Sequence, residues 1–174
     1  MQPLTSPPCG FYGADEMVTS FAVSGGGTDQ DQLRGVDVDG AGAVVAVGFF
    51  KSTTPTFGGV ELTNAGSADA VVWKMSADGT TLWAVRGGGS NGEYTYAIAV
   101  DASNAVVVSG HFKNSASTFG DVELTPVDDY DVVVWKMSAD GTTLWAVGGG
   151  GTGMDRSYGV AVVGRCSLTL SNPR

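Results

Sequence analysis

The chain has 174 residues, enough for one ordinary domain, and 43% of them are apolar, which is enough to bury a core. It contains 27 glycines and only 16% charged residues, a composition typical of short strands joined by tight turns and unlike that of long exposed helices. A net charge of −9 makes nucleic acid or an anionic membrane surface a poor partner, and no apolar run is long enough for a membrane-spanning helix.

The two ends of the chain differ from the rest. The start, MQPLTSPPCG, has neither the basic region nor the apolar stretch of a secretory signal. Cys9 and Cys166 lie in these end segments, as free thiols or as one bridge, and they indicate no redox compartment. Residues 1–13 and 164–174 are interpreted as irregular end segments outside the repeat. Residues 1–10 and about 164–174 carry Pro, Cys and polar residues without a pattern, so we expect them to be poorly ordered.

A repeat with a period of about 62 residues dominates the sequence between the ends. Residues 25–86 align with residues 87–148 without a gap, and both copies contain the run VVWKMSADGTTLWAV. The trailing part of a copy precedes them at 14–24, and the leading part of another follows at 149–163. Residues 14–163 are therefore interpreted as a tandem array.

Four short strands are predicted in each copy. In the first copy, residues 33–38 and 44–50 are β-branched apolar runs joined by an Asp-Gly-Ala-Gly turn. After a longer connection at 51–68, residues 69–76 and 80–85 form the clearest hairpin, around an Ala-Asp-Gly turn. No window has helical spacing, so we expect over a third of the residues in strands, in four-stranded antiparallel units that recur with the period of the repeat.

Four strands in a unit of this length are typical of a β-propeller blade, since a solenoid coil is shorter and an immunoglobulin-like domain is longer. The expected fold is all-β: tandem four-stranded antiparallel blades of a β-propeller in an incomplete, open array. Closed propellers use about four to eight blades, so two full copies leave the faces of the outer blades exposed. We therefore expect a fragment of a longer propeller, or a chain that binds a protein partner or associates with itself through exposed blade edges.

A fixed order of short motifs supports this fold. Between Gly48 and Gly89 the chain reads G-F-F, T-F-G-G, E-L-T, D-A-V-V-W-K-M and W-A before G-G-G. This order resembles the SBBP-type beta-propeller repeat over about residues 21–162. Trp73 and Trp135 stand where that family has a small residue. The resemblance implies a propeller fold, and its motifs are structural rather than signs of an activity.

Acidic residues are the candidate cation ligands. Asp37 and Asp39 alternate before Gly40 as in a calcium loop, but only two carboxylates are present and Ala99 replaces Asp37 in the second copy. A turn-forming Asp-Gly is favoured for this motif.

A second acidic cluster consists of Asp128, Asp129 and Asp131. A solvated loop explains these residues about as well as a cation site does. Asp69, which recurs as Asp131, precedes a strand, where an Asp side chain commonly caps a turn.

Aromatic residues recur with the repeat. Four tryptophans could stack on sugar rings, but their Val, Leu and Ala neighbours favour packing between strands. We expect equivalent, largely buried positions within each of the pairs Trp73 and Trp135, and Trp83 and Trp145.

No reaction is indicated by these residues. His111 is the only histidine and Phe49 replaces it in the first copy, no nucleophile or zinc motif occurs, and the triple glycines at 25–27 and 87–89 are interpreted as linkers between blades. An enzyme built on repeats must break their symmetry with unique polar residues, whereas these copies differ mostly by conservative changes or in loops. A non-catalytic structural or protein-interaction module is therefore favoured, without an assigned catalytic residue, cofactor or metal ligand. The alternative is part of a propeller-type enzyme or a carbohydrate- or calcium-binding module.

Overall fold

The structure, a computed structural model, describes residues 20–163. Within this range it contains thirteen strands and no helix, and strands with isolated bridges cover 53% of the residues. Neighbouring strands in every sheet pair antiparallel. The prediction of an all-β fold with over a third of the residues in strands is confirmed.

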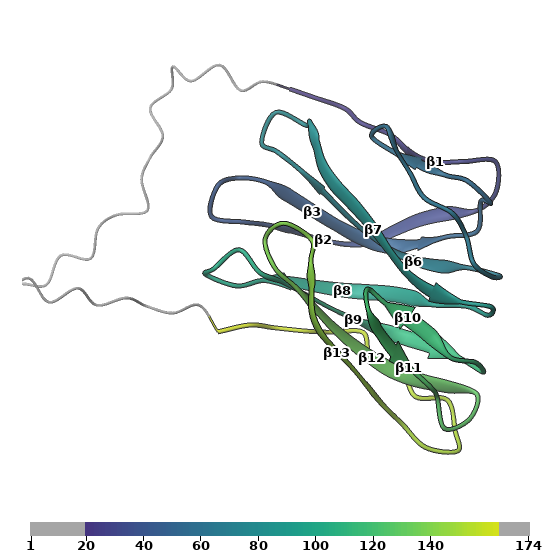
Figure 1. Cartoon of the computed structure of the whole chain (residues 1–174). Coiled ribbons are helices and arrows are strands. Elements are labelled where there is room, and N and C mark those ends of the chain that lie inside the picture. The colour runs from purple at the N-terminus through teal and green to yellow at the C-terminus, as the bar shows by residue number, and fades with distance from the viewer. Residues whose placement is uncertain (1–19, 164–174) are drawn as a thin grey trace, which may run out of the picture.

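The largest sheet has six strands, in the order β11-β10-β7-β6-β3-β2 (Figure 1). Four of them come from the first copy: β2 (Asp31–Val38), β3 (Val44–Phe50), β6 (Asp69–Met75) and β7 (Thr81–Gly89). The other two come from the second copy: β10 (Ser117–Phe119) and β11 (Val122–Leu124). They form a hairpin that pairs with the end of β7 and so ties the two copies together.

The second sheet has four strands, in the order β13-β12-β9-β8. They are β8 (Tyr94–Val100), β9 (Val106–Lys113), β12 (Tyr130–Met137) and β13 (Thr143–Gly149). A small third sheet consists of β1 (Gly25–Gly26), β4 (Thr56–Phe57) and β5 (Val60–Glu61). It repeats, one copy earlier in the chain, the pairing of β10 and β11 with β7.

The four predicted strands of each copy are present, with bounds that differ by a few residues. The predicted turns are also present, and Gly42 and Gly79 adopt the positive φ values of 80° and 86° that such turns require. The connection at 51–68 contains the hairpin β4–β5, which was not predicted because each strand has only two residues. The sheets hold three, six and four strands, because each hairpin pairs with the glycines that begin its copy and not with the four longer strands that follow them.

Five of the six glycines in the two triple-glycine runs are strand residues, so the interpretation of these runs as linkers was wrong. Gly87 to Gly89 pair with β10, and Gly25 and Gly26 form β1. Close approach explains the glycines: a Cβ on Gly87 would lie 2.5 Å from the Phe119 ring. A side chain at this position would separate the hairpin from the strand.

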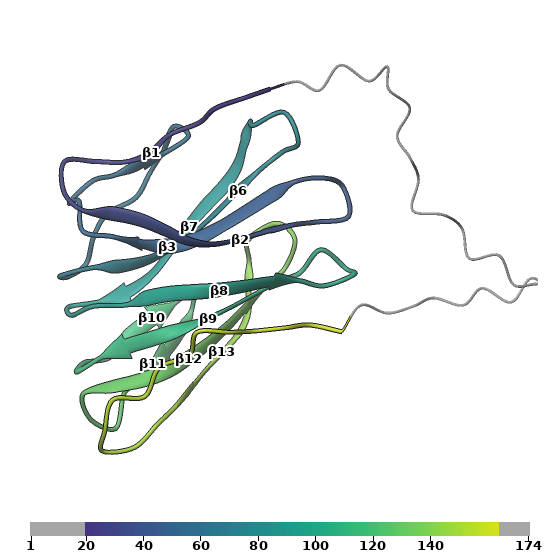
Figure 2. The same cartoon turned by 180° about the vertical axis from the view of Figure 1, so that it is seen from behind.

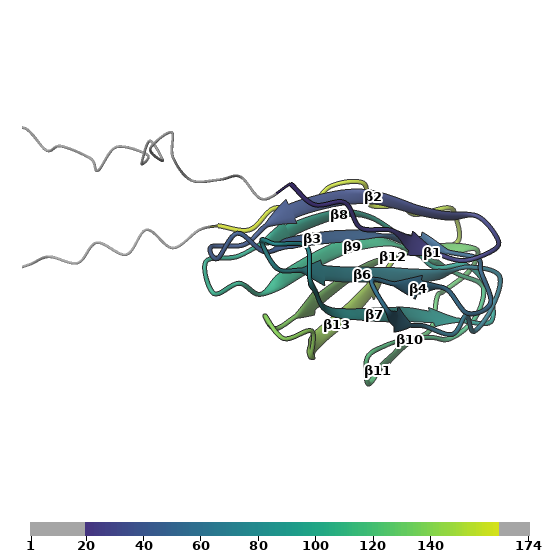
Figure 3. The same ribbon diagram turned by 90° about the horizontal axis from the view of Figure 1, so that it is seen from above.

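The two large sheets stack, and the main hydrophobic core lies between them. The first strands of the two copies, β2 and β8, lie side by side at one edge, and β7 and β13 lie toward the opposite edge (Figure 3). After β13 the chain returns across the second sheet, where Ser157 and Gly159 contact Ser109 of β9 (Figure 2). The predictions for residues 1–13 and 164–174, and those for Cys9 and Cys166, fall outside the described residues.

Candidate functional site

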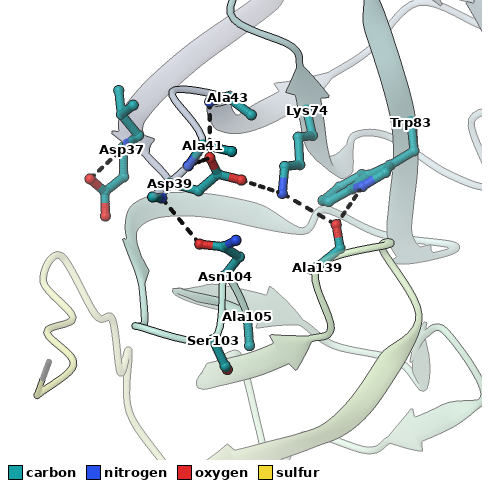
Figure 4. A network of polar contacts seen from close by, with 12 residues as sticks. Asp37, Asp39, Ala41, Ala43, Lys74, Trp83, Ser103, Asn104, Ala105 and Ala139 are labelled. Carbon is teal, nitrogen blue, oxygen red and sulfur yellow. Dashed lines mark hydrogen bonds and ion pairs between the residues drawn. The ribbon is translucent and has the colours of Figure 1, made fainter. Parts of the chain in front are cut away.

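A polar network joins the two copies (Figure 4). Lys74 Nζ on β6 lies 2.8 Å from Asp39 Oδ2, and the two side chains are only 4% and 3% exposed. The same ammonium group donates to the backbone oxygen of Ala139, in the β12–β13 turn of the second copy, at 3.3 Å. Trp83 Nε1 on β7 donates to that oxygen at 3.1 Å. One carbonyl of the second copy therefore accepts hydrogen bonds from two side chains of the first.

Asp39 is fixed by its own turn. Its Oδ1 accepts hydrogen bonds from the backbone N–H groups of Ala41 and Ala43 at 2.8 and 2.9 Å. Burial by itself would raise the pKa of Asp39, but the hydrogen bonds from Lys74 and from these backbone groups hold it below its usual value. The turn-forming interpretation of this residue is confirmed.

The other carboxylate of the motif, Asp37, also bonds to the second copy. Its Oδ2 accepts the N–H of Val100 at 2.7 Å, and the Gly40 N–H donates to Asn104 Oδ1 at 3.1 Å. The acidic motif at 37–40 thus fastens one copy to the next through backbone groups.

An apolar contact accompanies the network. The indole of Trp83 lies against Gly141, where a Cβ would approach the ring to 2.9 Å. Gly141 also has a φ of 86°, so two constraints require glycine there. Val45 and Val47 of the first copy are buried in one core with Val108 of the second, and Ile98 packs against it.

The same contact occurs at the N-terminal side of the first copy. Phe21, which is equivalent to Trp83 in the preceding partial copy, lies against Gly79, the equivalent of Gly141, and this glycine also has a φ of 86°. Residues 20–24 therefore pack against the first copy as the end of a preceding copy would.

At the C-terminal side the contact is open. The Lys136–Asp101 pair has the same 2.8 Å separation as Lys74–Asp39, but its side chains are 24% and 17% exposed. Hydrogen bonds from Lys136 and Ser103 hold the pKa of Asp101 well below its usual range. Trp145 is 41% exposed. The prediction that Trp83 and Trp145 are both largely buried was wrong: Trp83 is half-buried and Trp145 is exposed, because nothing within residues 20–163 covers Trp145 as the β12–β13 turn covers Trp83.

The prediction for Trp73 and Trp135 is confirmed, since they are 2% and 1% exposed. Their indole nitrogens donate to Thr81 Oγ1 at 3.0 Å and to Thr143 Oγ1 at 2.9 Å. These contacts lie within one copy and are therefore the same in both.

Buried carboxylates cap the loops that precede β6 and β12. Asp69 Oδ2 accepts the Ala65 N–H, and Asp131 Oδ2 accepts the Val127 N–H, both at 3.0 Å. The prediction of turn caps is confirmed. Burial raises the pKa of Asp69, which hydrogen bonds and the Arg86 charge partly offset.

Glu93 is also fully buried, and burial raises its pKa to about 7 against hydrogen bonds from the Gly89 N–H and the Ser117 hydroxyl. The acidic cluster of Asp128, Asp129 and Asp131 is divided: Asp128 is exposed, and Asp129 lies 3.6 Å from Lys113. Across residues 20–163, no group of three or more His, Cys, Asp or Glu side chains could hold a metal ion.

An aromatic cluster surrounds His111 on β9. The rings of Tyr94, Tyr96 and Tyr130 lie 5.1, 5.3 and 5.0 Å from the buried imidazole. Burial lowers the pKa of His111 to about 4, and the charges of two arginines act in the same direction. The imidazole is therefore neutral at pH 7.

Those two arginines lie over aromatic rings of the cluster. The Arg34 guanidinium is 4.4 Å from the Tyr96 ring, and that of Arg156 is 4.8 Å from the Tyr130 ring. Within residues 20–163, no ion pair joins either arginine to a carboxylate. Arg34, Tyr96 and Tyr158 are equivalent positions of successive copies, so the copies differ in chemistry here. Sequence reasoning missed this cluster, which a comparison of the copies for polar replacements could have found.

The described part of the chain has no helix long and apolar enough to cross a membrane. No model of a known protein family matches the chain, and no curated protein matches it either. The interpretation of function rests on geometry.

Proposed function

We propose that this chain is a non-catalytic structural or protein-interaction module, a stretch of a β-propeller-type array of the SBBP kind. In this proposal each copy contributes a four-stranded blade, and the short hairpins fasten each blade to the one before. The repetition of strands supports it: β2, β3, β6 and β7 recur in the next copy as β8, β9, β12 and β13, and the four strands pair with one another in the same order.

The single observation that carries the proposal is that the contact between copies recurs in an incomplete form at both ends. The C-terminal face, formed by Lys136, Trp145 and Val147, has the side chains that Lys74, Trp83 and Val85 use to bind the second copy. The N-terminal face, formed by Leu33, Val36 and Val38, is exposed, whereas its equivalents Thr95, Ile98 and Val100 contact the first copy.

The two faces are complementary halves of one interface, so the partner that fits them is a second molecule of this chain. Trp145 and Lys136 of one molecule would donate to the Ala77 carbonyl of the next, as Trp83 and Lys74 do to Ala139. Phe21, which lies on Gly79, would have to leave, and so would residues 157–162, which contact the second copy where Thr95 to Val100 contact the first. Such head-to-tail contacts are heterologous and can repeat along an array.

Sedimentation velocity at about 1–100 µM tests this proposal. We expect concentration-dependent association, which Trp145→Ser should weaken at least about tenfold because a central tryptophan usually dominates an interface. Leu144→Ser is the matched control: Leu144 is 54% exposed, close to the 53% of its equivalent Leu82 in the completed contact, so it lies outside the interface. A well-folded monomer at every concentration would contradict the proposal.

Ligand binding at the aromatic cluster is a second candidate, favoured by two arginines that lie beside tyrosine rings and have no carboxylate partner among residues 20–163. This chemistry fits an acidic sugar, whose carboxylate binds guanidinium and whose ring stacks on tyrosine. Titration with uronic-acid oligosaccharides in a thermal-shift assay tests it. Arg34→Gln should abolish a response, and neutral oligosaccharides should give none.

A further inference from the structure

A buried acid pair is balanced by an arginine at one place in the repeat. Asp69 and Glu93 are both fully buried, and their charges act on each other. Arg86 of β7 reaches them: its Nη1 lies 2.8 Å from Asp69 Oδ2, and its charge lowers the pKa of both acids against the effect of burial. A guanidinium group is thus the counter-ion of this first acid pair.

The second acid pair, at the equivalent positions one repeat later, has no such partner. It consists of Asp131 and Asp155, and Gly148 stands where the first pair has Arg86. Asp131 is only 3% exposed, and its Oδ1, like the equivalent Asp69 Oδ1 of the first pair, has no hydrogen-bond partner within the described residues. No ion pair there joins either carboxylate to a cation. Burying a carboxylate without a counter-charge costs several kcal/mol, and no group within the described residues replaces the Arg86 guanidinium at the second pair.

The geometry brings the two acids to one point. A Cβ on Gly150 would lie 2.5 Å from Asp131 Oδ1 and 2.9 Å from Asp155 Oδ2, so both oxygens face the space beside this glycine. Backbone N–H groups hold the carboxylates in place, Val127 on Asp131 Oδ2 and Gly151 on Asp155 Oδ2.

The space beside the second pair is also open. A Cβ on Gly149 or Gly151 would meet nothing within 4 Å. At Gly89, the equivalent of Gly151, the Ala116 carbonyl fills that volume. Two nearby cations, Lys113 and Arg156, lie over the Tyr130 ring instead. An ion can therefore approach the half-buried Asp155 from solvent, and it must lose water to contact the shielded Asp131 Oδ1.

We propose that Asp131 and Asp155 bind a hard divalent cation, with Ca²⁺ as the probe, in place of the guanidinium group of the first pair. Carboxylate oxygens are preferred ligands of Ca²⁺, and water on the open side would complete its six to eight oxygens. Because the site has only two carboxylates and belongs to no larger acidic group, its dissociation constant for Ca²⁺ should be on the order of 0.1–1 mM. This proposal does not depend on how the chain associates.

Thermal unfolding of the purified chain tests the site. After treatment with a chelator, titration with CaCl₂ to about 10 mM should raise Tm by about 3–6 °C with saturation, because a ligand that binds only the folded state stabilises it. Isothermal titration calorimetry should show one site. NaCl at matched ionic strength controls for general screening and should give no saturable change.

Two variants decide the interpretation. Gly148→Arg restores the arginine of the first pair on a strand residue without positive φ, so it should raise Tm without Ca²⁺ and abolish the response. Asp155→Asn should also abolish the response while leaving an oxygen to accept the Gly151 N–H. Asp121→Asn, at an exposed carboxylate in the β10–β11 turn, should keep it. Absence of a saturable response in the unmodified chain, or its persistence in Gly148→Arg or Asp155→Asn, would overturn the proposal.

Discussion

Trp83 and Trp145 have the same sequence neighbours and lie in equivalent strands, yet one is half-buried and the other is exposed. The same holds for the ion pairs Lys74–Asp39 and Lys136–Asp101, which share a 2.8 Å separation and differ in solvent exposure. The difference arises outside each copy: the β12–β13 turn supplies Ala139 and Gly141 to the first copy, and nothing equivalent follows the second within the described residues. In a stacked array, a residue's energetic contribution therefore depends on the next copy as much as on its own.

The largest expected difference concerns the two ion pairs. Asp39→Asn should cost about 3–5 kcal/mol of unfolding free energy, because it leaves Lys74 buried without a counter-charge. Asp101→Asn should cost no more than about 1 kcal/mol, because solvent screens the partly exposed Lys136. Urea unfolding of both variants at pH 7 measures this, and equal costs would refute the comparison.

Truncation of the two tryptophans gives the next contrast. Trp83→Ala should cost about 2–3 kcal/mol, because it empties the contact with Gly141 and removes the hydrogen bond to Ala139. Trp145→Ala should cost less than about 1 kcal/mol in the monomer, because its indole is already largely in solvent. Both values come from urea unfolding at concentrations where the chain is monomeric, and a large cost for Trp145→Ala would show that the open face is already covered.

His111 and Phe49, which occupy equivalent positions, differ in pH dependence. The pKa of His111 is about 4 in the folded protein and about 6.5 in the unfolded chain, so the unfolded state binds more protons between these values. Stability from this residue is present above pH 6.5 and is lost as the pH falls toward 4.

His111→Phe removes this loss. As the pH falls from 7 to 5, the unfolding free energy of the variant should therefore rise by about 2 kcal/mol relative to that of the unmodified protein. Glu93, whose raised pKa acts in the opposite direction, is present in both proteins and cancels in the comparison. Urea unfolding at both pH values gives the difference, and an unchanged difference would show that His111 is charged in the folded state.

The smallest expected effect is the internal control. Thr81→Val and Thr143→Val each remove the acceptor of a buried indole N–H, of Trp73 and Trp135 respectively, and should each cost about 1–2 kcal/mol. The two costs should agree, because these contacts lie within one copy. Unequal costs would show that the copies differ internally as well as in their neighbours.

Strands, turns and turn-capping carboxylates could be predicted from the sequence because their signals are local. Short runs of β-branched apolar residues, an Asp-Gly turn and an Asp before a strand act over a few residues, and the repeat doubles each signal. The hairpin β10–β11 and the strand character of Gly87 to Gly89 could not be predicted in this way. Each depends on the other across a long stretch of intervening chain, and glycine runs look the same in a linker and in a strand pressed against an aromatic ring.

By itself the sequence determined the repeat, the four strands of each copy, and the burial of Trp73 and Trp135, because those properties depend on contacts inside one copy. Only the tertiary structure decided which equivalent residues are buried between copies, and which asymmetric residues gather around His111. It also brought Asp131 and Asp155 to one point where Gly148 leaves out an arginine. The physical reason is that desolvation and charge compensation depend on every group within a few ångströms, and neighbouring copies supply those groups from positions distant in the chain.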